Sequence, residues 1–199
     1  DAEQGELYAA TECGGMLVTG GRDGSIKLWE QGTWTCVRSL EGDTAGVQDL
    51  LVHGDWLLSG SFDNTVRVWD RTSWECLRVV QTGHTCGVLS LAVHDGKLYC
   101  GCGHFDPTIR VIDTTTWASV GVMEGHTSTV RQLLVREGKL FSCSSDRTIK
   151  TWTTGEGRAC EQTLEGHTDW VRTMVVLGDR LLTGSDDNTL RVWGMDQGT

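Results

Sequence analysis

The sequence predicts an all-β fold built from five similar repeats, and three observations support this prediction. Short runs of β-branched and other apolar residues alternate along the chain with turns that contain Gly, Asp or Asn. No stretch combines helical periodicity with capping residues, and the one proline, Pro107, precedes a strand pattern. A turn followed by an alternating strand also recurs at intervals of 40, 43, 40 and 41 residues. The five copies reach the same alignment column at Trp29, Trp69, Ile112, Trp152 and Trp193.

The second repeat shows how each element is expected to form. Its strands are expected over residues 47–53, 56–61, 65–69 and 75–80. The Gly54-Asp55 pair and the "FDN" stretch that ends at Asn64 supply the first two turns. Such short turns between β-branched runs are typical of antiparallel hairpins. Each repeat is therefore predicted to be a four-stranded antiparallel sheet, and the repeats are expected over residues 1–40, 41–80, 81–123, 124–164 and 165–199.

Both faces of each predicted sheet carry apolar residues. In the second repeat, Val66 and Val68 lie on one face, and the adjacent Leu57 and Leu58 point to opposite faces. A neighbouring sheet must cover each face, which favours radial stacking of the sheets around an axis. The sequence thus predicts a single β-propeller domain over residues 1–199.

The fifth repeat contains only three strand patterns. Fourth strands are expected over residues 35–40, 75–80, 118–123 and 159–164, whereas the "GMDQGT" stretch after Trp193 is short and polar. Three arrangements fit this pattern: part of a larger propeller, five blades that close with one incomplete sheet, or an open array whose end sheets associate with another chain.

Composition narrows the classes of partner. The formal net charge of −10 argues against nucleic acid or an anionic membrane as the main partner, because both attract clustered Lys and Arg. The sequence has neither a membrane-spanning apolar run nor an N-terminal signal-peptide pattern. Most of the eight cysteines fall inside apolar strand patterns, which favours reduced thiols and a cytoplasmic or nuclear location.

Three segments carry a family resemblance: "TGHTCGVLSLAVHDGKLYCG", "EGHTSTVRQLLVREGKLFSC" and "EGHTDWVRTMVVLGDRLLTGSDDNTLRVW". With Gly-His at one end and Trp at the other, followed by Asp in the second repeat, the repeats resemble the WD-repeat (WD40) β-propeller family over essentially the whole chain. The "DGKL" and "GDRL" turns are similar to those of WD domains in RING and F-box ubiquitin ligases and in myosin heavy-chain kinases. The resemblance implies a non-catalytic scaffold for protein partners, without a cofactor.

The resemblance also implies a structural hydrogen-bond network in each repeat. It links the His of Gly-His, a Ser or Thr of the second strand, the turn Asp and the Trp of the third strand. Asp43 replaces the His in the second repeat, and Cys100 and Ile112 replace the Ser and the Trp in the third. Two repeats carry the full set, namely His126, Ser142, Asp146 and Trp152, then His167, Thr183, Asp187 and Trp193.

Two groups of residues imitate catalytic or metal sites. The Ser, His and Asp sets have the composition of a hydrolase triad, but a nucleophile is needed once and this set recurs, which favours a structural role. The run Cys100, Cys102 and His104, with His84 as a further candidate, has one residue between its cysteines, whereas paired zinc ligands prefer two to four. We therefore expect no catalytic residue, no cofactor and no metal.

The resemblance places partner contacts at the third and fifth positions after the His column and just before the turn Asp. Aromatic residues and Arg are enriched at binding hot spots, and Arg suits an acidic or phosphorylated peptide. The alternative is that the aromatic rings cover the core rim and the arginines pair with nearby carboxylates. The predicted contact residues are Tyr8, Arg22, Gln48, Phe62, Leu89, Phe105, Arg131, Trp170, Arg172 and Asp186.

Two other functions remain open at this stage. An assembly subunit would associate through the unpaired sheets at the ends of the array. A propeller enzyme would need a set of acid, base or metal ligands that occurs once, and the candidates found here are repeated or lie in core columns.

Overall fold

A computed structural model describes residues 5–103, 105–155 and 157–194 of the chain. These residues form nineteen strands and no helix, so nothing among them is a helix that could span a membrane. The strands form four sheets of four strands and one sheet of three, all with antiparallel neighbours, which confirms the predicted all-β class and the short last repeat. The chain divides into two compact units, Asp1–Leu91 and Ala92–Thr199, which we describe separately.

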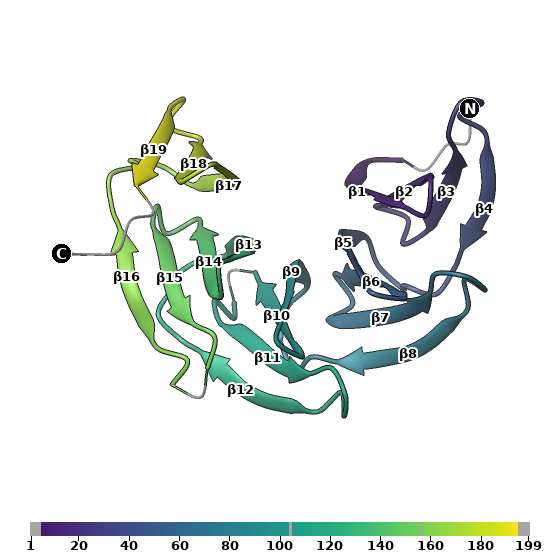
Figure 1. The fold of residues 1–199 in the computed structure, drawn as a ribbon, viewed down its shortest axis with the longest axis horizontal. Coiled ribbons are helices and arrows are strands. Elements are labelled where there is room, and N and C mark those ends of the chain that lie inside the picture. Colours follow the sequence, from purple (N-terminus) through teal and green to yellow (C-terminus); the bar gives the residue numbers. More distant parts are fainter. Residues whose placement is uncertain (1–4, 104, 156, 195–199) are drawn as a thin grey trace. The chain divides into compact units, whose positions relative to one another are not determined.

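The first compact unit contains two complete sheets (Figure 1). In each sheet the strands lie in sequence order, as expected for hairpins joined by short turns. The first sheet consists of β1 (Leu7–Cys13), β2 (Met16–Gly21), β3 (Ile26–Glu30) and β4 (Cys36–Leu40). The second consists of β5 (Val47–His53), β6 (Trp56–Ser61), β7 (Thr65–Asp70) and β8 (Cys76–Gln81).

The boundary between the compact units falls within β9 (Val88–His94), which pairs with β10 (Lys97–Cys102) in a sheet completed by β11 (Ile109–Asp113) and β12 (Ser119–Met123). The next sheet consists of β13 (Val130–Arg136), β14 (Lys139–Ser144), β15 (Ile149–Thr153) and β16 (Cys160–Leu164). The last consists of β17 (Val171–Leu177), β18 (Arg180–Ser185) and β19 (Leu190–Gly194), without a fourth strand among the described residues.

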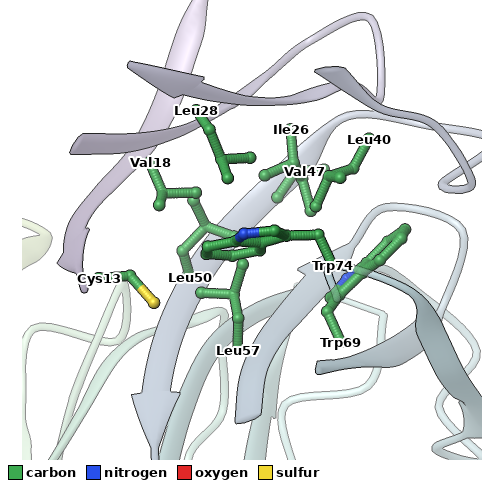
Figure 2. Close-up of a cluster of buried hydrophobic side chains, with 10 residues drawn as sticks. All are labelled: Cys13, Val18, Ile26, Leu28, Leu40, Val47, Leu50, Leu57, Trp69 and Trp74. Carbon is green, nitrogen blue, oxygen red and sulfur yellow. The ribbon is translucent and has the colours of Figure 1, made fainter. Parts of the chain in front are cut away.

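Facing sheets bury an apolar cluster between them. In the first compact unit, Val18, Ile26 and Leu28 of the first sheet meet Val47 and Trp69 of the second, as Figure 2 shows. The sheets approach so closely that a Cβ atom on Gly20 would lie 2.5 Å from Cγ1 of Val47. Within the second compact unit, similar clusters join β9–β12 to β13–β16 and β13–β16 to β17–β19.

The cysteines only partly follow the expectation of reduced, buried thiols. Six are free thiols, of which Cys13, Cys100 and Cys143 are buried, while Cys76 and Cys160 are exposed on fourth strands. Cys86 and Cys102 are disulfide-bonded, which contradicts the expectation at these two positions. The cysteines therefore give weaker support for a reducing compartment than the sequence pattern suggests.

Candidate functional site

Two loops of each sheet meet at one edge, which we call the loop edge. These are the loop before the first strand and the loop between the second and third strands. A backbone hydrogen bond joins the two loops in the first, second, fourth and fifth sheets. The bonds are Arg22 N to Glu6 O (2.8 Å), Phe62 N to Gly46 O (3.0 Å), Ser145 N to Thr129 O (2.9 Å) and Asp186 N to Trp170 O (3.0 Å).

A β-bulge at the start of the first strand determines where four of the predicted contact residues lie. The pairing register shifts between Leu7 and Ala9, and equivalent shifts occur in β5, β13 and β17. A bulge leaves one residue out of the ladder and changes the direction of its side chain. The residues at the four bulges are Tyr8, Gln48, Arg131 and Arg172.

In the first compact unit, the loop edge carries an exposed aromatic pair. The rings of Tyr8 and Phe62 meet edge to face, with 6.4 Å between their centroids. Phe62 lies against Gly87, where an added Cβ would come within 2.4 Å of the ring. Glu6 accepts a hydrogen bond from the Tyr8 hydroxyl (2.9 Å), which raises the Tyr8 pKa, and forms a 3.3 Å ion pair with Arg22. The charge of Arg22 is therefore already balanced.

In the second compact unit, the loop edge carries a tryptophan flanked by two arginines. The guanidinium carbons of Arg131 and Arg172 lie 5.1 and 4.8 Å from the ring centroid of Trp170, within cation–π range. Arg172 also donates to both carboxylate oxygens of Asp186 at 2.6–2.9 Å, and this bond raises the pKa of Arg172. We call Arg131, Trp170, Arg172 and Asp186 the Arg–Trp cluster.

Arg131 differs from Arg172 in its partners. Its Nε donates to Ser145 Oγ at 2.8 Å, and within the described part of the chain no carboxylate forms an ion pair with it. Burial lowers the pKa of Arg131, the nearby charge of Arg172 adds to this effect, and the charge of Asp186 opposes it. Arg22 and Arg172 therefore form direct ion pairs with carboxylates, whereas Arg131 forms none among the described residues.

The remaining predicted contact residues are Gln48, Leu89 and Phe105. Phe105 is strongly exposed, and Leu89 is half-buried. Gln48 is also half-buried, and its Nε2 atom has no hydrogen-bond partner among the described residues. The sequence pattern gave no indication of this buried amide.

The fourth sheet contains a continuous chain of buried hydrogen bonds. Trp152 Nε1 donates to Ser142 Oγ (2.8 Å), which lies 2.7 Å from Nε2 of His126. Nδ1 of the same imidazole lies 2.7 Å from Asp146 Oδ2. An indole N–H can only donate a hydrogen bond, and a hydroxyl has one proton to donate. With a neutral imidazole, Trp152 therefore donates to Ser142, Ser142 donates to His126, and His126 donates to Asp146. Burial raises the pKa of Asp146, but the interactions with His126 and the hydrogen bonds from Thr148 Oγ1 and Thr127 N together outweigh it and hold the pKa below its usual value.

The fifth sheet repeats this chain with a threonine in place of the serine. Trp193 Nε1 donates to Thr183 Oγ1 at 2.9 Å, and His167 joins Thr183 and Asp187 at 2.8 and 2.7 Å. Each such chain ties the loop edge to the interior of its sheet. The recurring Ser or Thr is therefore held inside a core and has the geometry of a structural element.

The second sheet reaches the same result with different chemistry. Asp43, at the position of the histidine, accepts from Ser59 Oγ (3.2 Å) and forms a buried ion pair with Arg67. Arg67 also pairs with Asp63 at 3.0 Å, and Trp69 Nε1 donates to Ser59 Oγ at 3.0 Å. Sequence reasoning missed Arg67, although an acidic residue in the histidine column together with an Arg near the Trp column is a detectable signal.

A second group that sequence reasoning missed links the first strands of adjacent sheets. Asp49 of β5 accepts a hydrogen bond from Leu91 N of β9 at 2.7 Å. In the same column of β13, Gln132 accepts from Met174 N of β17 at 2.7 Å and from Thr173 Oγ1 at 3.1 Å. Burial raises the pKa of Asp49 to about 6, since its hydrogen bonds only partly offset the loss of water.

The Cys-x-Cys-x-His pattern stays untested as a metal site. His104 lies outside the described residues, and Cys100 is a buried free thiol in a strand column. Among the described residues of the third sheet, Cys100 and Ile112 fill the columns of the serine and the tryptophan as buried residues.

Comparison with solved structures supports the fold. The chain superimposes on the WD40 β-propeller domain of Doa1 with a TM-score of 0.86 at 25% identity, over 99% of this chain and 66% of that chain. It matches the computationally designed Ika8 protein with a TM-score of 0.80 at 27% identity, over 97% of this chain and 59% of that one. The chain thus spans about three fifths of the length of these structures.

Comparison of sequences agrees with this result. A 41-residue segment is 46% identical to the nuclear distribution protein PAC1 of Arthroderma otae (strain ATCC MYA-4605 / CBS 113480), which is 21% of this chain and 9% of that protein. The family model "WD domain, G-beta repeat" matches residues 9–30, 34–70, 74–113, 117–153 and 158–194. These five matches cover most of the chain, which therefore belongs to the WD40 repeat family, whose propeller domains are generally non-catalytic modules that bind other proteins.

Proposed function

We propose that the chain is a scaffold that binds an acidic segment of a partner protein at the loop edge of β13–β19. The observation that carries this proposal is Arg131, a half-buried guanidinium without a carboxylate partner among the described residues, which lies beside the exposed ring of Trp170. A cation in partly dry surroundings interacts strongly with an anion, because less water screens the pair.

The neighbours of Arg131 hold it ready for such an anion. The Ser145 hydroxyl engages its Nε group, and no described residue engages the two terminal nitrogens of the guanidinium, which can therefore bind a carboxylate or phosphate. Arg172 forms an ion pair with Asp186 and also contacts the Trp170 ring. The proposed roles are therefore anion binding by Arg131, apolar contact by Trp170 and positioning by Arg172 and Asp186.

The first compact unit offers a different kind of contact. Tyr8 and Phe62 expose apolar ring surface, whereas the nearby cation of Arg22 is balanced by Glu6. This pair suits an apolar side chain of a partner. A role in substrate recognition for a ubiquitin ligase or a kinase, in the cytoplasm or nucleus, rests on the resemblance of the short turns alone.

The proposal is tested by selecting binders from a random peptide display library against the whole chain. We expect the selected peptides to be enriched in Asp and Glu, and their affinity to fall at least about tenfold for Arg131→Ala, measured by calorimetry. Arg136→Ala is the matched control, because Arg136 lies in the same strand and is exposed beside Glu137. Unchanged affinity for the Arg131→Ala, Trp170→Ala double variant would overturn the proposal.

A further inference from the structure

The guanidinium of Arg131 can engage more than one kind of anion through its hydrogen bonds. Its Nε donates to Ser145 Oγ at 2.8 Å. The two terminal nitrogens form a second edge of the planar guanidinium, which can donate two parallel hydrogen bonds. A carboxylate presents two oxygens to such an edge, and a phosphate can do the same. The hydrogen-bonding geometry of Arg131 alone therefore does not separate these two anions.

The charges around Arg131 favour an anion with a single negative charge. Arg172 is committed to Asp186, to which its Nε and Nη2 atoms donate at 2.6–2.9 Å. Burial lowers the pKa of Arg131, and the charge of Asp186 opposes this effect, so the carboxylate lies within electrostatic range of Arg131. Among the described residues, the Arg–Trp cluster thus carries one net positive charge, which Arg131 supplies.

A second carboxylate next to the cluster strengthens this preference. Asp169 precedes Trp170, whose backbone N–H donates to Asp169 Oδ1 at 2.8 Å. The hydrogen bonds to Asp186 raise the pKa of Arg172, and the charges of Asp186 and Asp169 raise it further. A phosphorylated side chain carries a charge of about −1.5 to −2 at neutral pH, and like charges repel at close range. One carboxylate matches the cation of Arg131, whereas a phosphate would bring a second negative charge close to Asp169 and Asp186.

Several backbone N–H groups of the neighbouring loops already have acceptors. Phosphates and chain-terminal carboxylates are often held by a concave set of backbone N–H groups. In the loops of the fourth and fifth sheets, such groups instead donate to carbonyl, hydroxyl or carboxylate oxygens of the same chain. They belong to Ser145, Asp146, Trp170, Asp186 and Asp187. These donors are not available to a terminal carboxylate, which favours a carboxylate on a side chain.

We propose that the Arg–Trp cluster binds the side-chain carboxylate of a Glu or Asp residue in the partner segment and discriminates against a phosphorylated residue at the same position. This inference rests on the proposed function, because it requires that Arg131 receives an anion of the partner. Arg131 binds the carboxylate oxygens, and the exposed ring of Trp170 contacts the methylene groups beside them. Asp186 sets the discrimination, since it pairs with Arg172 and repels a second negative charge.

Peptide libraries with one fixed central residue test the proposal without a known partner. The central residue is Glu, phosphoserine or Gln, the other positions are random without Asp or Glu, and both ends of each peptide are capped. A further library has a Gln centre and a free C-terminal carboxylate. The binding of each library to the whole chain is measured by fluorescence polarisation at neutral pH, for the parent and for Arg131→Ala.

We expect the Glu library to bind at least about fivefold more tightly than each of the other libraries, and Arg131→Ala to remove this preference. Equal or tighter binding of the phosphoserine library, lost in Arg131→Ala, would overturn the preference for a carboxylate and would still support the proposed function. Tightest binding of the library with the free C-terminal carboxylate would overturn the assignment to a side chain. If Arg131→Ala changes the affinity of no library, the preference and the proposed function both fail.

The variant Asp186→Asn tests the cause of the discrimination. It releases Arg172 from its ion pair and removes the nearby negative charge, so the phosphoserine library should gain at least about tenfold in affinity relative to the Glu library. Asp179→Asn is the matched control, because it removes the same charge from the turn between β17 and β18, at the other end of these strands. Circular dichroism checks that both variants keep the strand content of the parent. No gain in Asp186→Asn, or an equal gain in both variants, would overturn the role assigned to Asp186.

Discussion

Replacing Ser142 with alanine is predicted to destabilise the fourth sheet more than any change of side-chain volume at this position explains. Ser142 is fully buried, and its hydroxyl forms hydrogen bonds with both the Trp152 indole and the His126 imidazole. Without that oxygen, two buried polar groups lose a hydrogen-bond partner, and each such loss costs about 1–3 kcal/mol. Losses at neighbouring groups do not add fully, so we expect a decrease of about 3 kcal/mol in the free energy of unfolding.

Urea unfolding followed by circular dichroism and by tryptophan fluorescence measures this change, provided that the two signals report one transition. Ser142→Thr is the matched control, because Thr19 and Thr183 occupy the same column in other sheets and are buried there. Threonine keeps the hydroxyl and adds a methyl group, for which we expect a cost of about 1 kcal/mol. If alanine costs no more than threonine, the hydrogen-bond chain does not stabilise the sheet and the reasoning is wrong.

Three further predictions follow from the buried charges. Burial raises the folded-state pKa of Asp49 to about 6, so the folded state holds this proton more tightly than the unfolded chain and stability falls as pH rises from 4 to 6. Asp49→Asn, which imitates the amide of Gln132, should flatten this decline and stabilise the chain at pH 7 by about 2–3 kcal/mol. Urea unfolding at several pH values measures both effects, and an unchanged pH profile would contradict the prediction. Arg67→Ala leaves Asp43 buried without its cation and should cost about 3–5 kcal/mol, whereas Arg67→Met together with Asp43→Leu should recover most of that stability. The pKa of Asp146 lies below its usual value, so its contribution is complete above pH 4 and is lost on acidification, and Asp146→Asn should weaken the acid dependence of the melting temperature.

The repeat period made most of the strands predictable. The expected strands at residues 47–53 and 56–61 match β5 and β6. The fourth strands begin one residue later than predicted and end as predicted, except that β8 ends one residue later. These elements follow from local turn chemistry and apolar columns, both of which can be read from one sequence. The four-membered hydrogen-bond chains in the fourth and fifth sheets join the residues that the family pattern groups together.

Contacts between sheets were harder to predict. The bond from Leu91 N to Asp49 depends on the position of the next sheet, which the sequence of a single repeat does not define. The ion pair of Arg67 with Asp43 replaces a histidine by two residues far apart in the sequence, so a column-by-column comparison sees only a missing residue. The sequence also did not show which arginine pairs with Asp186. In the structure Arg172 does, while Arg131 donates to Ser145 and forms no ion pair among the described residues.

The most direct test of the proposed function is a double-mutant cycle between Arg131 and an acidic residue of a selected peptide. The four dissociation constants come from the wild-type chain and Arg131→Ala, each with the peptide and with its Glu→Gln version. If Arg131 binds the peptide carboxylate, the two changes should couple by at least about 1 kcal/mol. Additive effects within error would mean that the acidic residue binds elsewhere, which would contradict the role assigned to Arg131.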